Sequence, residues 1–170
     1  MARLLTPQPL EKQSFKEFGD VRDTSESRVL TINEGNTERY NDLATLAIYR
    51  EDGTPSVNIF RSKPCSLPFV IKFMERHPFS SQTFFPLSGE PYLVVVAPRG
   101  EMVASAVKAF LAQPDQGVNF HPGVWHHYNL ALNKVSDFLV IDMITGTPNC
   151  DEIALKREDQ INLVTPYNEQ

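Results

Sequence analysis

The sequence predicts an all-β fold, an antiparallel β-barrel with one or two short helices. Short segments rich in Val, Ile, Phe, Leu and Tyr recur along the chain, turn residues separate them, and only two segments have a helical pattern. The predicted strands are residues 30–35, 45–52, 56–61, 69–76, 82–87, 91–98, 117–120, 124–132 and 137–143. The 13 prolines fit turns between such strands better than helix interiors.

Two segments favour a helix. In residues 11–19, Phe15 and Phe18 lie three positions apart and Gly19 suits a C-cap. In residues 101–114, apolar side chains form one stripe before a proline. That stripe consists of Val103, Val107, Phe110 and Leu111. Too few helices alternate with strands for a parallel sheet with crossover helices.

Size and charge limit the classes of function. A chain of 170 residues with 41% hydrophobic residues is expected to form one domain, residues 1–170. The net charge of -5 argues against a nucleic-acid partner. No long apolar run and no signal-peptide pattern is found, so we expect a cytoplasmic protein with no membrane partner. Cys65 and Cys150 lack metal or redox spacing and are expected to be packed thiols or bystanders.

Histidines mark the candidate site. Three of the four, His121, His126 and His127, lie in residues 116–132 with the only tryptophan, and the fourth is His77. Glu75 and His77 are two apart, so on a strand both point to one face while Arg76 points to the other. After a turn at residues 78–81, Gln82 is expected to return on the adjoining strand and face them. Carboxylate, imidazole and amide groups converging in this way chelate a divalent metal or hold a small polar substrate.

The same spacing resembles the first cupin motif, HxH(x)4E(x)6G. Glu75 replaces the first histidine, His77 is the second, Gln82 replaces the glutamate and Gly89 is the glycine. The second cupin motif is matched only by a glycine at position 123 followed three residues later by His126. This likeness implies a cupin-type barrel, the double-stranded β-helix or jelly roll.

A more particular resemblance covers most of the chain. Eight blocks in order look like those of the ureidoglycolate lyase family: residues 32–44, 58–69, 74–87, 92–98, 116–120, 123–127, 137–142 and 149–152. The resemblance implies a cupin-type homodimer that splits ureidoglycolate into glyoxylate and urea in allantoin and purine breakdown. The sequence departs from the family pattern at Tyr128-Asn129, at His121-Pro122 and at Ser80, which border the expected pocket.

The residue types suit this chemistry. Cleavage needs a base for the substrate hydroxyl and an acid for the departing nitrogen. His126 and His77, with an ordinary pKa of about 6.5, are candidate bases, and Glu75 is a candidate acid or base if its pKa is raised. A divalent metal (Ni, Mn or Zn) bound by Glu75, His77, Gln82 and His126 would lower the pKa of the substrate hydroxyl and so assist the base. No nucleotide or organic cofactor is expected.

The substrate carboxylate needs a cationic or polar partner. Arg39 and Arg61 are the candidates, because guanidinium binds carboxylates bidentately, and strand alternation disfavours Arg76. Gln82 and Tyr128 are further candidate substrate contacts, since Tyr128 would share the face of His126 on a continuous strand.

The sequence also predicts how the chain assembles and leaves two alternative functions. Trp125 and His127 alternate away from His126 and are expected to pack or to form an interface. With the abundant aromatic residues, this predicts a homodimer that uses strands or segment 101–114. The alternative functions are another metal-dependent cupin enzyme acting on a small hydroxy acid, or a cupin that binds a small molecule without catalysis.

Overall fold

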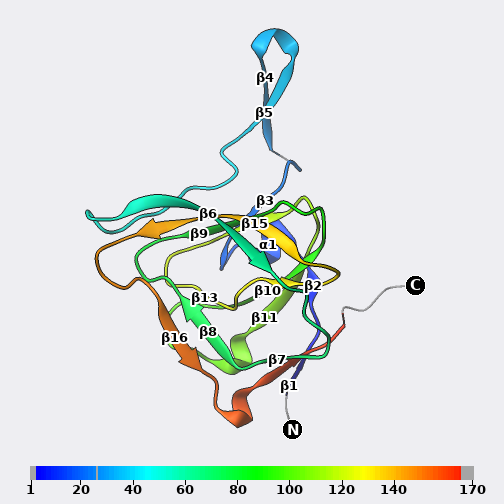
Figure 1. Ribbon diagram of the computed structural model, residues 1–170, viewed down its shortest axis with the longest axis vertical. Helices are drawn as coiled ribbons and strands as arrows, with labels where there is room; N and C mark the ends of the chain where they lie inside the picture. The colour runs from blue at the N-terminus through cyan, green and yellow to red at the C-terminus, as the bar shows by residue number, and fades with distance from the viewer. Residues whose placement is uncertain (1–2, 26, 166–170) are drawn as a thin grey trace.

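Two large β-sheets face each other and carry most of the fold (Figure 1). The computed structural model of the protein describes residues 3–25 and 27–165. Nearly all strand pairs are antiparallel; the pairs β1–β17 and β2–β11 are parallel. The predicted all-β class with one or two short helices is confirmed; the two large sheets form a sandwich in the manner of a jelly roll rather than a closed barrel.

Each large sheet combines strands from distant parts of the chain. One has the order β16 (Asp151–Ala154), β8 (Phe73–Arg76), β13 (Trp125–His126), β10 (Tyr92–Ala97), β11 (Lys108–Ala112) and β2 (Gln8–Pro9), with β14 (Leu130–Ala131) also paired to β10. The other has the order β3 (Gly19–Arg22), β12 (Gly117–Phe120), β9 (Gln82–Pro86), β15 (Ser136–Ile144) and β6 (Thr54–Ser62).

Smaller elements complete the described chain. A three-stranded sheet has the order β1 (Arg3–Leu5), β17 (Ile161–Leu163) and β7 (Phe69–Ile71), and β4 (Arg28–Ile32) pairs with β5 (Thr37–Asn41). The helical elements are α1 (Lys12–Phe15) and the 3-10 turns η1 (Asn33–Gly35), η2 (Ala104–Ala106) and η3 (Arg157–Asp159). Among the described residues, no helix is long and apolar enough to cross a membrane.

The core has two layers, one on each face of the β8–β13–β10–β11 sheet. The inner layer fills the space between the two large sheets, where Val94 and Val96 of β10 meet Phe84, Phe120 and side chains from β15. The outer layer joins the opposite face of β10 to the three-stranded sheet. Because β10 is buried on both faces, it is a continuous apolar run rather than an alternating one.

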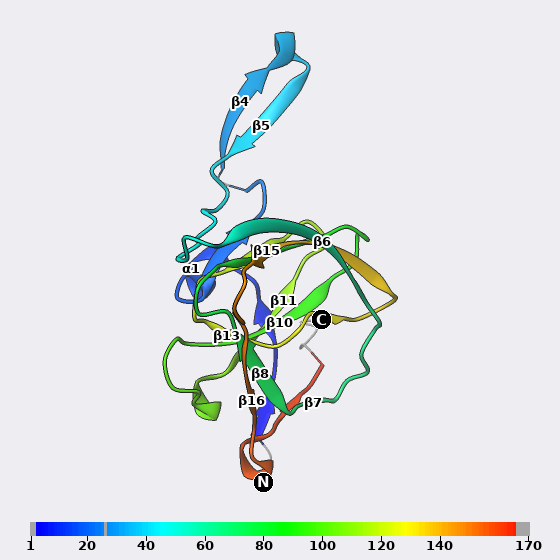
Figure 2. The ribbon, with the colours of Figure 1, turned by 60° about the vertical axis from the view of Figure 1, so that its left-hand side comes forward.

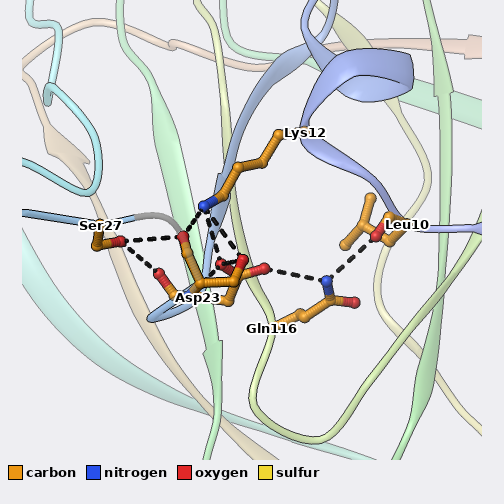
Figure 3. A network of polar contacts seen from close by, with 6 residues as sticks. Leu10, Lys12, Asp23, Ser27 and Gln116 are labelled. Atoms are coloured by element: carbon orange, nitrogen blue, oxygen red, sulfur yellow. Dashed lines mark hydrogen bonds and ion pairs between the residues drawn. The ribbon is translucent and has the colours of Figure 1, made fainter.

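The β4–β5 hairpin projects away from the sheets in both views (Figures 1 and 2). Its base is held by Asp23, which lies between β3 and the hairpin (Figure 3). Asp23 Oδ1 accepts from the Ser25 N–H at 3.0 Å and is 3.0 Å from Lys12 Nζ, and Asp23 Oδ2 accepts from Gln116 Nε2 at 3.2 Å. Gln116 also donates to the Leu10 carbonyl at 3.1 Å, so one buried carboxylate ties three chain segments together.

The predicted helix over 101–114 is wrong. The segment forms η2 and then strand β11, in which Phe110 packs in the inner core while Ala109 packs in the outer core. A strand buried on both faces has apolar residues at consecutive positions, and these also satisfy a helical spacing. Periodicity alone therefore cannot separate the two structures.

Three local predictions also need correction. Helix α1 has one turn, and Gly19 is a strand residue rather than a C-cap: a Cβ there would lie 2.0 Å from the Asn119 carbonyl oxygen. Segment 45–52 contains a single bridge, between Ile48 and Ser80, in place of a strand. Residues 124–132 form two short strands, β13 and β14, with a break between them.

Candidate functional site

Two neighbouring strands place a carboxylate beside an imidazole in the interior. Glu75 of β8 and His126 of β13 are directly paired, and Glu75 Oε1 lies 3.7 Å from His126 Nδ1. Their neighbours Met74 and Trp125 pack in the outer core. Strand alternation therefore turns Glu75 and His126 to the inner face.

His77 joins this pair from the end of β8. Its ring centroid lies 5.3 Å from that of His126, and one ligand atom from each of Glu75, His77 and His126 lies within 4.8 Å of the others. His77 Nδ1 is 2.6 Å from the backbone oxygen of Asn149. The structure thus brings together all three residues predicted to be catalytic.

Gln82 approaches from the opposite sheet. It does not lie on an adjoining strand, as predicted, because the chain crosses between the sheets from β8 to β9. On β9, Gln82 is paired with Phe120 of β12, so their side chains share a face. The Phe120 ring is stacked on His126, with centroids 4.4 Å apart and planes 6° apart. Gln82 therefore lies on the face that looks toward the imidazoles.

Several polar atoms of this cluster have no hydrogen-bond partner in the protein. The described residues contain six buried side-chain nitrogen or oxygen atoms without a hydrogen bond, and four of them are His77 Nε2, Gln82 Oε1 and both ring nitrogens of His126. Buried polar groups in native proteins are almost always hydrogen-bonded, because leaving them unpaired costs free energy. Their concentration in one place indicates a site that a ligand completes.

Burial controls the protonation of the site. It raises the pKa of the Glu75 carboxyl; the charge of His77 opposes this shift and that of Glu152 adds to it. Burial, helped by the charge of His77, lowers the pKa of His126 well below its usual value. His126 is consequently neutral near pH 7, the form in which imidazole accepts a proton or binds a metal.

The flanking residues have structural contacts. Trp125 Nε1 donates to the Gly100 carbonyl at 3.0 Å, and the Arg76 guanidinium lies over the indole ring. His127 is buried between Phe69 and Phe73, and burial lowers its pKa to about 4. The expectation that these side chains alternate away from His126 is confirmed, and both are covered by their own chain.

Three residues predicted to contact substrate lie elsewhere. Arg39 is on the projecting β4–β5 hairpin, paired with Leu30. Arg61 forms a two-bond ion pair with Asp137, at 2.7 and 2.8 Å, on the outer face of β6 and β15. Tyr128 follows the end of β13, is 46% exposed and packs against the rings of His127 and Phe73, so it does not share the face of His126.

Residues 142–150 shape the approach to the cluster and were not predicted to do so. With His77 and Ser80 they line a cavity of about 520 Å³. Cys150 lies close enough to Glu75 and Glu152 to form a second group of metal-binding atoms. However, burial and the charges of Glu75, Glu152 and Asp151 raise the pKa of the Cys150 thiol to about 11, so it stays protonated at neutral pH. The sequence feature that could have indicated this segment is the block of residues 149–152, which resembles the ureidoglycolate lyase family.

The donor set fits a divalent metal. Imidazole nitrogens, a carboxylate and an amide oxygen are ligands used for such ions, and ring nitrogens of His77 and His126 have no hydrogen-bond partner here. The predicted ligands Glu75, His77, Gln82 and His126 therefore converge from both sheets.

The two facing sheets and this interior cluster define an all-β protein of cupin type with a site suited to a small polar molecule. Residues 2–162 match the family described as ureidoglycolate lyase. The chain belongs to that family, which confirms the resemblance seen in the sequence blocks.

Relatives agree with this assignment along most of the chain. A ureidoglycolate lyase of Burkholderia cepacia is 47% identical over 154 residues, covering 90% of this chain and 87% of the relative. One from Pseudomonas aeruginosa is 43% identical over 169 residues, covering 99% of each.

Solved structures give a weaker likeness. A dTDP sugar isomerase from Desulfovibrio desulfuricans has a TM-score of 0.46 at 12% identity, covering 81% of this chain and 85% of that one. RmlC from Streptococcus suis, in complex with dTDP-D-xylose, also has a TM-score of 0.46 at 12% identity, covering 87% of this chain and 73% of that one. Similarity at this level does not bear on the substrate.

Proposed function

We propose that this chain, acting as one domain, cleaves ureidoglycolate into glyoxylate and urea at the cluster of Glu75, His77 and His126. The observation that carries the assignment of the site is the set of buried, unpartnered imidazole nitrogens beside a carboxyl group of raised pKa. Membership of the ureidoglycolate lyase family supports the choice of substrate.

The reaction is an elimination that consumes no water. The hydroxyl proton leaves the carbinol oxygen, the oxygen lone pair forms the new C=O bond, and the C–N bond breaks with its electrons going to the ureido nitrogen. That nitrogen then takes a proton and leaves as urea. The enzyme must supply one proton acceptor and one proton donor on either side of the carbinol carbon.

The cluster offers both groups. The neutral His126 imidazole, with the buried and unpartnered His77 Nε2 beside it, supplies the acceptor for the hydroxyl proton. Glu75 supplies the donor, because its raised pKa lets it hold a proton closer to neutral pH than an ordinary carboxyl group does. Gln82 Oε1, a free acceptor, would bind a ureido N–H and orient the C–N bond.

A divalent metal fits the same residues. Glu75, His77, Gln82 and His126 would hold it, and when bound it would supply Lewis-acid polarisation of the substrate hydroxyl and carboxylate. Ni, Mn and Zn remain the proposed identities. Activity before and after treatment with a chelator, and after each ion is restored, measures this requirement.

We also propose a homodimer. Support comes from the outer face of the paired strands β6 and β15, where Val57 is 70% exposed and Ile59 is 56% exposed. Apolar groups of this size on one surface favour association. Light scattering should give a particle of twice 19.2 kDa, and a 19.2 kDa particle at all concentrations would contradict the proposal. The cytoplasmic location stays a prediction.

The direct test of function is product analysis. Purified protein incubated with ureidoglycolate should release glyoxylate and urea in equal amounts. Release of ammonia would instead indicate hydrolysis of the ureido group, and the absence of any product would contradict the proposal.

A further inference from the structure

The turn after His77 is tied to Asn149 where β-pairing ends. Strands β8 and β16 are antiparallel, with Arg76 opposite Asp151. Continuing this register would place Asn149 opposite Pro78, which has no N–H to donate. The Asn149 side chain takes over: its Oδ1 accepts the Phe79 N–H at 2.9 Å, and its Nδ2 donates to Ser80 Oγ at 2.8 Å.

These two bonds hold the Asn149 backbone against the His77 ring. The Asn149 carbonyl oxygen lies 2.6 Å from His77 Nδ1. A carbonyl only accepts, so Nδ1 carries a proton, and in the neutral ring the lone pair is then on Nε2. That Nε2 is buried and has no hydrogen-bond partner, and the His77 side chain belongs to the cluster with Glu75 and His126.

We propose that Asn149 is a positioning residue: its side chain anchors its own carbonyl, and the carbonyl fixes His77 in the orientation and tautomer that present the Nε2 lone pair to the site. The inference rests on the proposed function, because a lone pair at His77 Nε2 is needed both for accepting the hydroxyl proton and for binding a metal. Partners that orient a functional histidine in this way commonly contribute 10- to 100-fold to activity or metal affinity, as an order of magnitude.

The test combines nitrogen NMR of the histidine side chains with kinetics. In the purified wild-type protein, two-bond proton–nitrogen correlations should show His77 protonated at Nδ1 and bare at Nε2. In Asn149→Ala, His77 should become a mixture of tautomers, and kcat/KM for ureidoglycolate should fall by roughly 10-fold or more. The tautomer is compared in folded protein, because unfolding would also release the His77 ring from the Asn149 carbonyl.

Two further variants keep the test decisive. Ser80→Ala removes one of the two anchoring bonds and should shift His77 in the same direction by a smaller amount, which serves if Asn149→Ala does not fold. Asn133→Ala, which removes an exposed amide bonded to Glu90 at 2.8 Å, is the matched control and should change neither readout.

The outcomes separate this inference from the function. A wild-type His77 that is protonated at Nε2 overturns the positioning role. An unchanged His77 tautomer in folded Asn149→Ala also overturns it. If Asn149→Ala does not fold, an unchanged tautomer in Ser80→Ala has the same meaning. If the tautomer shifts as expected but the wild-type protein releases no glyoxylate and urea, the proposed function fails while the positioning contact stands.

Discussion

Two buried polar clusters of this protein differ in how their atoms are satisfied. At the base of the hairpin, both oxygens of Asp23 have hydrogen-bond or ion-pair partners, drawn from Lys12, Ser25 and Gln116 (Figure 3). Between the sheets, His77 Nε2 and both ring nitrogens of His126 have no hydrogen bond, and Glu75 Oε1 lies 3.7 Å from His126 Nδ1, beyond hydrogen-bond distance.

The difference separates a structural joint from a binding site. A buried polar network whose hydrogen bonds are all made is rigid, and it has no free donor or acceptor to offer to a ligand. An unsatisfied one costs stability, and that cost is recovered when a ligand supplies the missing partners. We therefore expect changes at the interior cluster to affect chemistry first, and changes at Asp23 to affect stability first.

The largest effect is expected from His126→Ala. Loss of a positioned base or ligand should lower kcat/KM for ureidoglycolate by on the order of 10²-fold or more, measured by glyoxylate release. His127→Ala should cost less in chemistry and more in stability, because that side chain packs between Phe69 and Phe73. A folded His126→Ala enzyme with wild-type activity would remove His126 from the site. Recovery in excess divalent metal would favour the ligand role over the base role.

Asp23→Ala should show the reverse pattern. Its removal leaves Gln116 and the Ser25 backbone without their buried acceptor, so the free energy of unfolding should fall by about 1–3 kcal/mol. Urea denaturation measures this change. The kcat/KM of the folded fraction should stay at the wild-type value. A loss of kcat/KM without a loss of stability would contradict the structural role of Asp23.

Acid should weaken the Asp23 joint. Burial alone would raise the pKa of Asp23, but hydrogen bonds from Ser25, Gln116 and Lys12, with the charge of Lys12, outweigh it and hold the pKa below its usual value. The native state therefore binds fewer protons than the unfolded chain as the pH falls past the unfolded pKa of about 3.9. This contribution is complete above that pH and is lost below it. Unfolding free energies of Asp23→Asn should decline less steeply with acid than those of the wild type; parallel curves would contradict this.

The smallest effect is expected from Arg61→Ala. The guanidinium is bound to Asp137 on an exposed outer face, so its removal should leave kcat/KM unchanged in the glyoxylate assay. A clear rise in KM would show that Arg61 reaches the substrate after all, and that the outer face belongs to the site.

Local alternation along a strand was enough to predict the faces of the site. Glu75 and His77 oppose Arg76, and His126 opposes Trp125, because a strand repeats every two residues whatever surrounds it. The β-rich class and the family could also be predicted, since both depend on the order of segments along the chain. The ambiguity of segment 101–114 arose because burial on both faces removes that same alternation.

Contacts between distant residues were decided by the tertiary structure. Gln82 reaches the imidazoles from the opposite sheet, Arg61 is occupied by Asp137, and the Asn149 carbonyl, 72 positions from His77, sets the proton on its ring. None of these follows from local spacing, because each depends on how two sheets and a crossing chain are placed in space. The sequence by itself determined which residues could do the chemistry; the fold determined which of them meet.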